Sequence, residues 1–130
     1  MKWVHITFGL LLFVVFTQTG AFMRADFPDK DAISQELRIL MRSRHIYILF
    51  SSLIHIALGT YLIIDADVRR RIIQYLGSAV LFASSLLLVW AFISETYSVL
   101  GYSALSRNGI YLSLAGVGLH LLGGLTRRRI

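Results

Sequence analysis

The chain contains no cysteine, and only one of its 130 residues is proline. The absence of cysteine excludes disulfides, thiolate nucleophiles, iron–sulfur clusters and cysteine-ligated zinc. Charged residues are also scarce, at 15% against the roughly 25% of an average soluble domain. So few charges cannot cover a surface that faces water. With 56% hydrophobic residues and a mean hydropathy of +0.68, the composition predicts an integral membrane protein.

Known catalytic signatures are missing as well. The sequence has no glycine-rich phosphate loop, no HExxH or GxSxG motif, and no pair of carboxylates within an apolar stretch. Acids and bases at membrane depth are the components of proton pumps and cation pathways. We therefore expect a protein that is not an enzyme and that holds no metal. The net charge of +6 is assigned to membrane topology and anionic lipid rather than to nucleic acid.

Four apolar stretches are long enough to cross a hydrocarbon core, which takes about 20 helical residues. None of them contains Asp, Glu, Lys or Arg, and they cover residues 3–23, 46–64, 72–93 and 110–126. They leave no length for a domain outside the membrane. The sequence thus predicts one domain over residues 1–130, an all-α integral membrane protein built as a four-helix transmembrane bundle.

The segment between the first two stretches has a pattern of its own. Pro28 precedes Asp31, which we expect to be a helix N-cap. Apolar residues then recur at helical spacing, at Ile33, Leu37, Leu40 and Met41. This pattern predicts a short amphipathic helix over residues 31–44 that lies at the interface and continues into the second span. In the next connection, Asp65 or Asp67 is expected to cap the third helix.

The first stretch has an alternative interpretation as a signal peptide. Met1 and Lys2 form a short positive region, an apolar core follows, and residues 19–21 (Thr-Gly-Ala) resemble a small-residue cleavage site. Cleavage would leave three spans. Because the apolar stretch continues to Met23, which is long enough to span, we expect it to be retained.

The positions of Lys and Arg indicate an orientation. With four spans, both termini and the middle loop share one side, which carries seven Lys and Arg residues against six on the other. The triplets at residues 69–71 and 127–129 lie directly beside a membrane face. By the positive-inside rule, both termini are expected in the cytoplasm, in a plasma or inner membrane.

The triplet Arg69, Arg70 and Arg71 begins the third helix, where positive charge opposes the helix dipole. Helix stability therefore does not explain it. The sequence leaves two explanations open, a topology signal or a site for anionic lipid headgroups.

Two histidines, His55 and His120, are the candidate cofactor ligands. Both are expected near mid-membrane on helix faces that are rich in small residues, which also makes Gly59, Gly116 and Gly124 candidates for close helix packing. Two histidines from neighbouring helices are a recurrent way to hold haem b. The alternative is that both rings only form hydrogen bonds between helices and that no cofactor is bound. His5 and His45, at the span ends, are expected to face water.

Residues 52–59 (Ser-Leu-Ile-His-Ile-Ala-Leu-Gly) resemble the S-x-x-H-R-x-x-G segment of the succinate dehydrogenase membrane-anchor family. The resemblance covers eight residues and implies a haem- or quinone-binding anchor. The arginine that this family ties to quinone binding is replaced here by Ile56, and the span count is four rather than three. The quinone role is therefore not carried over to this chain.

Glu95 ends the third stretch and is the only acid outside the first connection and the middle loop. The nearest cation in sequence is Arg107, and we expect either an ion pair at the rim or a solvated helix end. A four-span chain with such a glutamate is similar to the small glutathione-transferase-like membrane enzymes. Their Arg-rich motif also contains Asn, which does not follow the arginines Arg42 and Arg44 here.

Taken together, these features predict a non-catalytic, multi-pass accessory subunit that packs in the lipid bilayer against other membrane subunits or copies of itself. The first alternative is a haem- or quinone-binding electron-transfer subunit that uses His55 and His120. The second is a homo-oligomeric pore or small-solute transporter, for which the sequence offers no selectivity-like ring.

Overall fold

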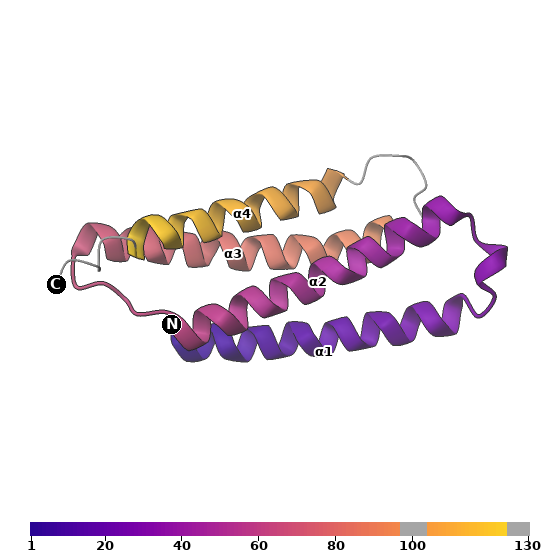
Figure 1. The fold of residues 1–130 in the computed structure, drawn as a ribbon, viewed down its shortest axis with the longest axis horizontal. Coiled ribbons are helices and arrows are strands. Elements are labelled where there is room, and N and C mark those ends of the chain that lie inside the picture. The colour runs from indigo at the N-terminus through magenta and orange to yellow at the C-terminus, as the bar shows by residue number, and fades with distance from the viewer. Residues whose placement is uncertain (97–103, 125–130) are drawn as a thin grey trace.

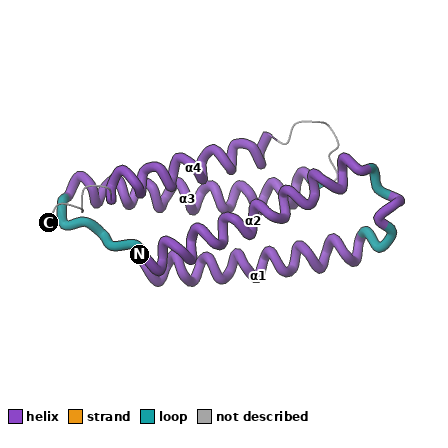
Figure 2. The backbone as a smooth tube through the Cα atoms, in the orientation of Figure 1, coloured by secondary structure: helices purple, strands orange, loops and turns teal. Residues whose placement is uncertain are grey.

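A computed structural model describes residues 1–96 and 104–124 of the chain, and these residues form helices joined by loops (Figures 1 and 2). Helix α1 covers Lys2–Asp26, α2 covers Gln35–Tyr61, α3 covers Val68–Glu95 and α4 covers Ala104–Gly124. A short 3₁₀ helix, η1, lies between α1 and α2 at Lys30–Ala32. The amphipathic helix was expected over residues 31–44. Residues 31 and 32 belong instead to η1, and residues 35–44 form the first part of α2, so the predicted continuation into the second helix is confirmed from Gln35 on.

The four helices form two antiparallel hairpins, α1 with α2 and α3 with α4, and α2 also packs against α3 (Figure 1). We call the end where α1 and α3 begin the terminal end, because Met1 and the last described turn of α4 lie there. The opposite end, where α2 and α4 begin, is the linker end. These two names are used below to locate the buried polar groups along the bundle.

Local capping explains where two of the helices begin. The Asp67 carboxylate accepts from the backbone N–H groups of Arg69 and Arg70 at 2.9 and 3.1 Å, so the predicted cap of the third helix is confirmed for Asp67. The prediction for Asp31 is wrong. Asp31 lies within η1, and the Ser34 hydroxyl accepts from the Leu37 N–H instead, because a cap must directly precede the first helical turn.

Two of the four helices, α1 and α3, are long and apolar enough to cross a membrane. Four such helices were expected from the sequence. Within residues 1–96 and 104–124, α2 and α4 fall short of the same measure, because the helical parts of their apolar stretches cover only residues 46–61 and 110–124 and the preceding turns carry arginines such as Arg44 and Arg107. The fold is therefore an all-helical bundle with two candidate spans.

The distribution of polarity is the reverse of that in a water-soluble bundle. Large apolar side chains lie on the outside, with Trp3 78%, Tyr61 82% and Leu122 65% exposed. The described side chains that are buried include more polar than apolar ones, and His5, Ser52 and His55 are 0% exposed. Soluble proteins bury Ile, Leu and Phe and keep most serines at the surface. The interior of this bundle thus contains many polar side chains.

Candidate functional site: a buried histidine and serine network

A continuous chain of hydrogen bonds crosses all four helices. We call it the histidine network, and it consists of His5 from α1, Ser51 and His55 from α2, Ser78 and Ser85 from α3, and His120 from α4. All six side chains are buried. Because a buried polar group without a partner is costly, such a network favours one arrangement of the helices over others.

The centre of the network is a pair of histidines. His5 Nδ1 lies 2.8 Å from His55 Nδ1, and the two rings are stacked with centroids 4.9 Å apart. Phe82 of α3 packs against both rings, with its ring centroid 5.0 Å from that of His5 and 4.8 Å from that of His55. Phe8 packs edge-on against His55 and Phe82. The two histidine rings are therefore enclosed by aromatic side chains and are not accessible to water.

Ser85 determines which nitrogen of His55 carries the proton. Its single hydroxyl proton is donated to the Leu81 carbonyl at 2.8 Å. The Ser85 oxygen must then accept from its other two neighbours, His55 Nε2 at 2.9 Å and the Ser51 hydroxyl at 2.6 Å. Hydrogen-bond accounting thus assigns the proton of a neutral His55 to Nε2 and leaves Nδ1 as an acceptor.

The same reasoning assigns the donors and acceptors in the rest of the network. His55 Nδ1 accepts from His5 Nδ1–H, so His5 Nε2 accepts from the Ser78 hydroxyl at 3.0 Å. Ser78 in turn accepts from His120 Nε2–H at 3.2 Å. The remaining nitrogen, His120 Nδ1, is a buried acceptor without a hydrogen-bond partner among the described residues. An unpaired acceptor is tolerated better than an unpaired N–H donor.

Close helix approach surrounds the network on both hairpins. A Cβ atom added at Gly59 would lie 2.3 Å from Ile6 Cγ1 and 2.8 Å from the Ile6 backbone nitrogen. A Cβ atom at Gly116 would lie 2.6 Å from Leu81 Cγ. No atom of the described residues lies within 4 Å of a Cβ atom at Gly124. Of the three glycines proposed for packing, the structure places Gly59 and Gly116 at tight contacts and Gly124 at none.

Serine hydroxyls join these close backbones directly. Ser52 of α2 donates to the Gly9 carbonyl of α1 at 2.7 Å. In the other hairpin, Ser84 of α3 donates to the Gly109 carbonyl of α4 at 2.7 Å and lies 2.5 Å from the Ser113 hydroxyl. Each hairpin thus has a serine that satisfies a backbone carbonyl of its partner helix.

The structure places the predicted histidines in one network but not face to face, because His5 lies between His55 and His120. The expectation that His5 faces water is wrong, since its side chain is 0% exposed. His5 shares a stripe with Gly9 and Leu12, the other buried residues of α1. The sequence signal that could have identified His5 is this spacing of three and four.

The network does not lie at the middle of α2. His55 lies six residues before the end of α2, which is about 9 Å along the helix. The network is therefore closer to the terminal end of the bundle. Among the described residues, no group of three or more His, Asp or Glu side chains is arranged to hold a metal ion.

A second polar centre lies at the linker end. The guanidinium of Arg44 is 2% exposed, and its Nε lies 3.7 Å from Glu95 Oε2. Arg44 also donates to the Glu95 backbone carbonyl. Burial lowers the pKa of the Arg44 guanidinium, and the Glu95 carboxylate opposes that shift. The buried ion pair joins α2 to α3.

Glu95 also organises the start of α4. Its carboxylate accepts from the Leu105 backbone N–H and from the Ser106 hydroxyl, each at 3.1 Å. A negative charge at a helix N-terminus is favoured by the helix dipole. The side chain of Glu95 is 13% exposed. The expectation of a solvated helix end is therefore wrong, and Arg44 is an ion-pair partner that the sequence did not single out.

The arginine triplet lies at the terminal end, in the first turn of α3. Arg70 pairs with Asp65, whose Oδ2 lies 3.7 Å from the Arg70 Nη1 atom. Arg69 and Arg71 are exposed. None of the three cavities described in the structure is lined by this triplet.

Comparisons with protein-family models, with curated proteins and with solved structures find no match for this chain.

Proposed function

We propose that this protein is a small multi-pass membrane subunit without catalytic activity, which packs against copies of itself or against a larger membrane complex. The observation that carries the proposal is the reversed polarity of the bundle, with satisfied serines and histidines inside and large apolar side chains outside. Lipid tails and the apolar faces of other membrane helices are the surroundings in which such an exterior is stable. In this proposal α2 and α4 cross the membrane together with α1 and α3.

The helix that we propose as the main contact to a partner is α1. Only 11% of the residues in the most apolar segment of α1 are buried within the single chain, compared with 44% in the corresponding segment of α3. Large apolar residues such as Leu10, Phe13 and Val14 therefore face outward. The histidine network supports a packing role for His55 and His120, because both nitrogens of His55 and Nε2 of His120 already have partners within the bundle.

The proposal is tested first by membrane extraction and by the mass of the detergent-solubilised protein. We expect the full chain to resist alkaline carbonate extraction and to migrate as an assembly larger than one copy, either of itself or with a co-purifying chain. Release by carbonate, or a single copy with no co-purifying chain, contradicts the proposal. A visible absorbance band that disappears in His55→Ala would replace it with the electron-transfer alternative.

Topology is tested by single cysteines, which are unambiguous because the chain has none of its own. With both termini in the cytoplasm, cysteines at Lys2 and Ala66 should be shielded from an impermeant thiol reagent in intact cells. A cysteine at Lys30 should react. Labelling at Ala66 would reverse the orientation, whereas labelling at Lys2 alone would remove α1 from the set of spans.

A further inference from the structure

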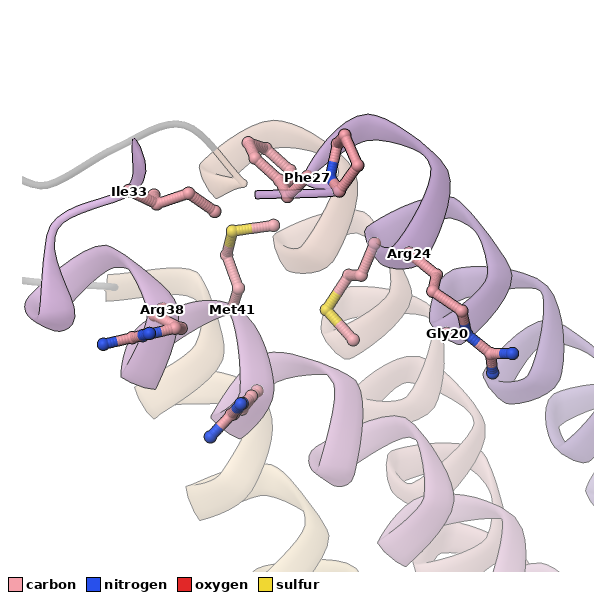
Figure 3. Close-up of a pocket in the computed structure, with 9 residues that line it drawn as sticks. Gly20, Arg24, Phe27, Ile33, Arg38 and Met41 are labelled. Carbon is pink, nitrogen blue, oxygen red and sulfur yellow. The ribbon is translucent and has the colours of Figure 1, made fainter. Parts of the chain in front are cut away.

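A cavity of about 270 Å³ opens at the linker end, between the last turns of α1, the segment around η1 and the first turns of α2 (Figure 3). Its walls are largely apolar. In Figure 3, Phe27, Ile33 and Met41 lie around the same space, while Arg24 and Arg38 lie on opposite sides of it with their guanidinium groups directed outward. The cavity thus combines an apolar interior with a basic rim.

The rim carries three arginines, Arg24, Arg38 and Arg42. Arg38 lies 4.0 Å from the exposed carboxylate of Asp31. Within residues 1–96 and 104–124, neither Arg24 nor Arg42 forms an ion pair, and both are exposed. Two exposed guanidinium groups without an ion-pair partner among the described residues therefore line a cavity with largely apolar walls.

The linker also carries acids, and their positions matter for this rim. Asp29 accepts the N–H of Asp31 and so caps η1, and Asp31 faces Arg38. Both carboxylates thus have local roles within the linker. Among the described residues, no carboxylate forms an ion pair with Arg24 or Arg42.

We propose that this cavity binds an anionic phospholipid, with a segment of acyl chain in the apolar interior and the phosphate at Arg24 and Arg42. The inference rests on the proposed function, because the linker end of a membrane bundle lies at the level of the headgroups. Arginine binds phosphate through two parallel N–H donors, which a lysine does not reproduce. The volume suits part of one lipid chain, since pockets for whole drug-sized ligands begin at about 300 Å³.

The arginine triplet at the terminal end provides a matched comparison. Arg69 and Arg71 carry the same charge as Arg24 and Arg42 and are also exposed, but they line none of the described cavities. If charge alone attracted anionic lipid, both pairs would contribute equally. If the cavity matters, only Arg24 and Arg42 would retain a bound lipid through purification.

The test measures lipid bound to the purified full chain in mild detergent by native mass spectrometry. Phosphatidylglycerol is titrated in parallel with phosphatidylcholine of the same chains. We expect Arg24→Gln/Arg42→Gln to bind phosphatidylglycerol about 25-fold more weakly, which is about fivefold for each arginine. Arg69→Gln/Arg71→Gln, the control with the same loss of charge, should bind as the unchanged protein does.

A second pair of variants tests the cavity without altering charge. Ile33→Trp places a larger side chain where Ile33 lines the cavity and should lower phosphatidylglycerol binding. Ile39→Trp, on an exposed face of α2, is its control and should have no effect. Circular dichroism and elution volume identify any variant that has lost its fold, so that the remaining variants still decide the question.

Three outcomes overturn the inference. Equal losses in the two arginine double variants would show general charge attraction. Displacement of the lipid by inorganic phosphate or glycerol phosphate would show a site for free phosphate. Undiminished binding in both Arg24→Gln/Arg42→Gln and Ile33→Trp would place the lipid elsewhere. In each case, continued resistance to carbonate extraction and an unchanged assembly mass would leave the proposed function standing, because these measurements fail only if that function is wrong.

Discussion

The two polar centres of this bundle both join helices through buried polar groups, but one is neutral and the other is charged. The histidine network, nearer the terminal end, is built from neutral rings and hydroxyls, whereas the linker end holds the charged pair Arg44 and Glu95. Neutral groups lose less solvation on burial than charges do. The charged pair therefore lies at a helix end, where the start of α4 supplies further hydrogen bonds to the carboxylate.

An apolar layer separates the two centres. Ile48 on α2 and Leu88 and Phe92 on α3 are each at most 4% exposed. By their positions in the sequence, they lie between the two centres along their helices. Arg44 and His55 are eleven residues apart, about 16 Å along α2. On α2 the hydrogen-bonded chain thus ends at Ser51, seven residues from Arg44, and no hydrogen bond given for the described residues joins it to the ion pair.

The largest expected effect comes from breaking the ion pair. Arg44→Leu should lower the free energy of unfolding by about 3–5 kcal/mol, because it removes the buried cation that faces the Glu95 carboxylate, which is only 13% exposed. Detergent-micelle unfolding by denaturant titration measures the change. Arg71→Leu, at an exposed position of α3, is the control. A loss of less than about 1 kcal/mol for Arg44→Leu would show that the pair is no stronger than an exposed one.

Helix contact beside the histidine network is the next test. Gly59→Ala should destabilise by about 1–3 kcal/mol, because its methyl group would overlap both the side chain and the backbone of Ile6. Gly124→Ala meets no neighbour and should be neutral or stabilising by up to about 1 kcal/mol through helix propensity. Thermal unfolding of the two variants gives the comparison. Equal tolerance of both changes would contradict the close contact between α1 and α2.

Within the histidine network, His55 should matter more than His120. His55→Ala removes two hydrogen bonds, whereas His120→Ala removes one, and each is worth about 0.6 kcal/mol in a membrane bundle. Denaturant titration should therefore rank His55→Ala as the more destabilising change. The reverse order would mean that His120 Nδ1 has a partner outside the described residues.

The smallest effect is expected at a single serine. Ser84→Ala removes the bond to the Gly109 carbonyl and should cost about 0.6 kcal/mol. Ser94→Ala, which donates only within its own helix at an exposed position, should be silent. A cost for Ser84→Ala well above 1 kcal/mol in the same titration would indicate that hydroxyls, rather than the ion pair, dominate the polar interior.

Much of the helical layout could be predicted because it depends on local signals. Long runs without charge indicate the helices, and Asp67 marks the start of α3 by its spacing to the first turn. The N-cap of α2 was missed because Asp31 and Ser34 are both good caps. Only the path of the chain through η1 selects Ser34.

The candidate site was predicted in part. His55 and His120 were recognised because they interrupt apolar stretches and share faces with small residues. His5 was missed because a histidine so close to the start of a helix is usually wetted. Its burial depends on Ser78 and Phe82, which are more than seventy residues away in sequence and come close only when α1 packs against α3.

The sequence by itself determined composition, helix positions and the scarcity of charge, because these follow from residue types and from local hydrogen bonding. Tertiary structure alone decided which polar groups meet. The pairing of Arg44 with Glu95, the insertion of His5 between two other histidines and the exclusion of Gly124 from close contact all depend on how helices rotate about their axes. That rotation is set by side-chain contacts across the whole bundle, to which each helix contributes only one face.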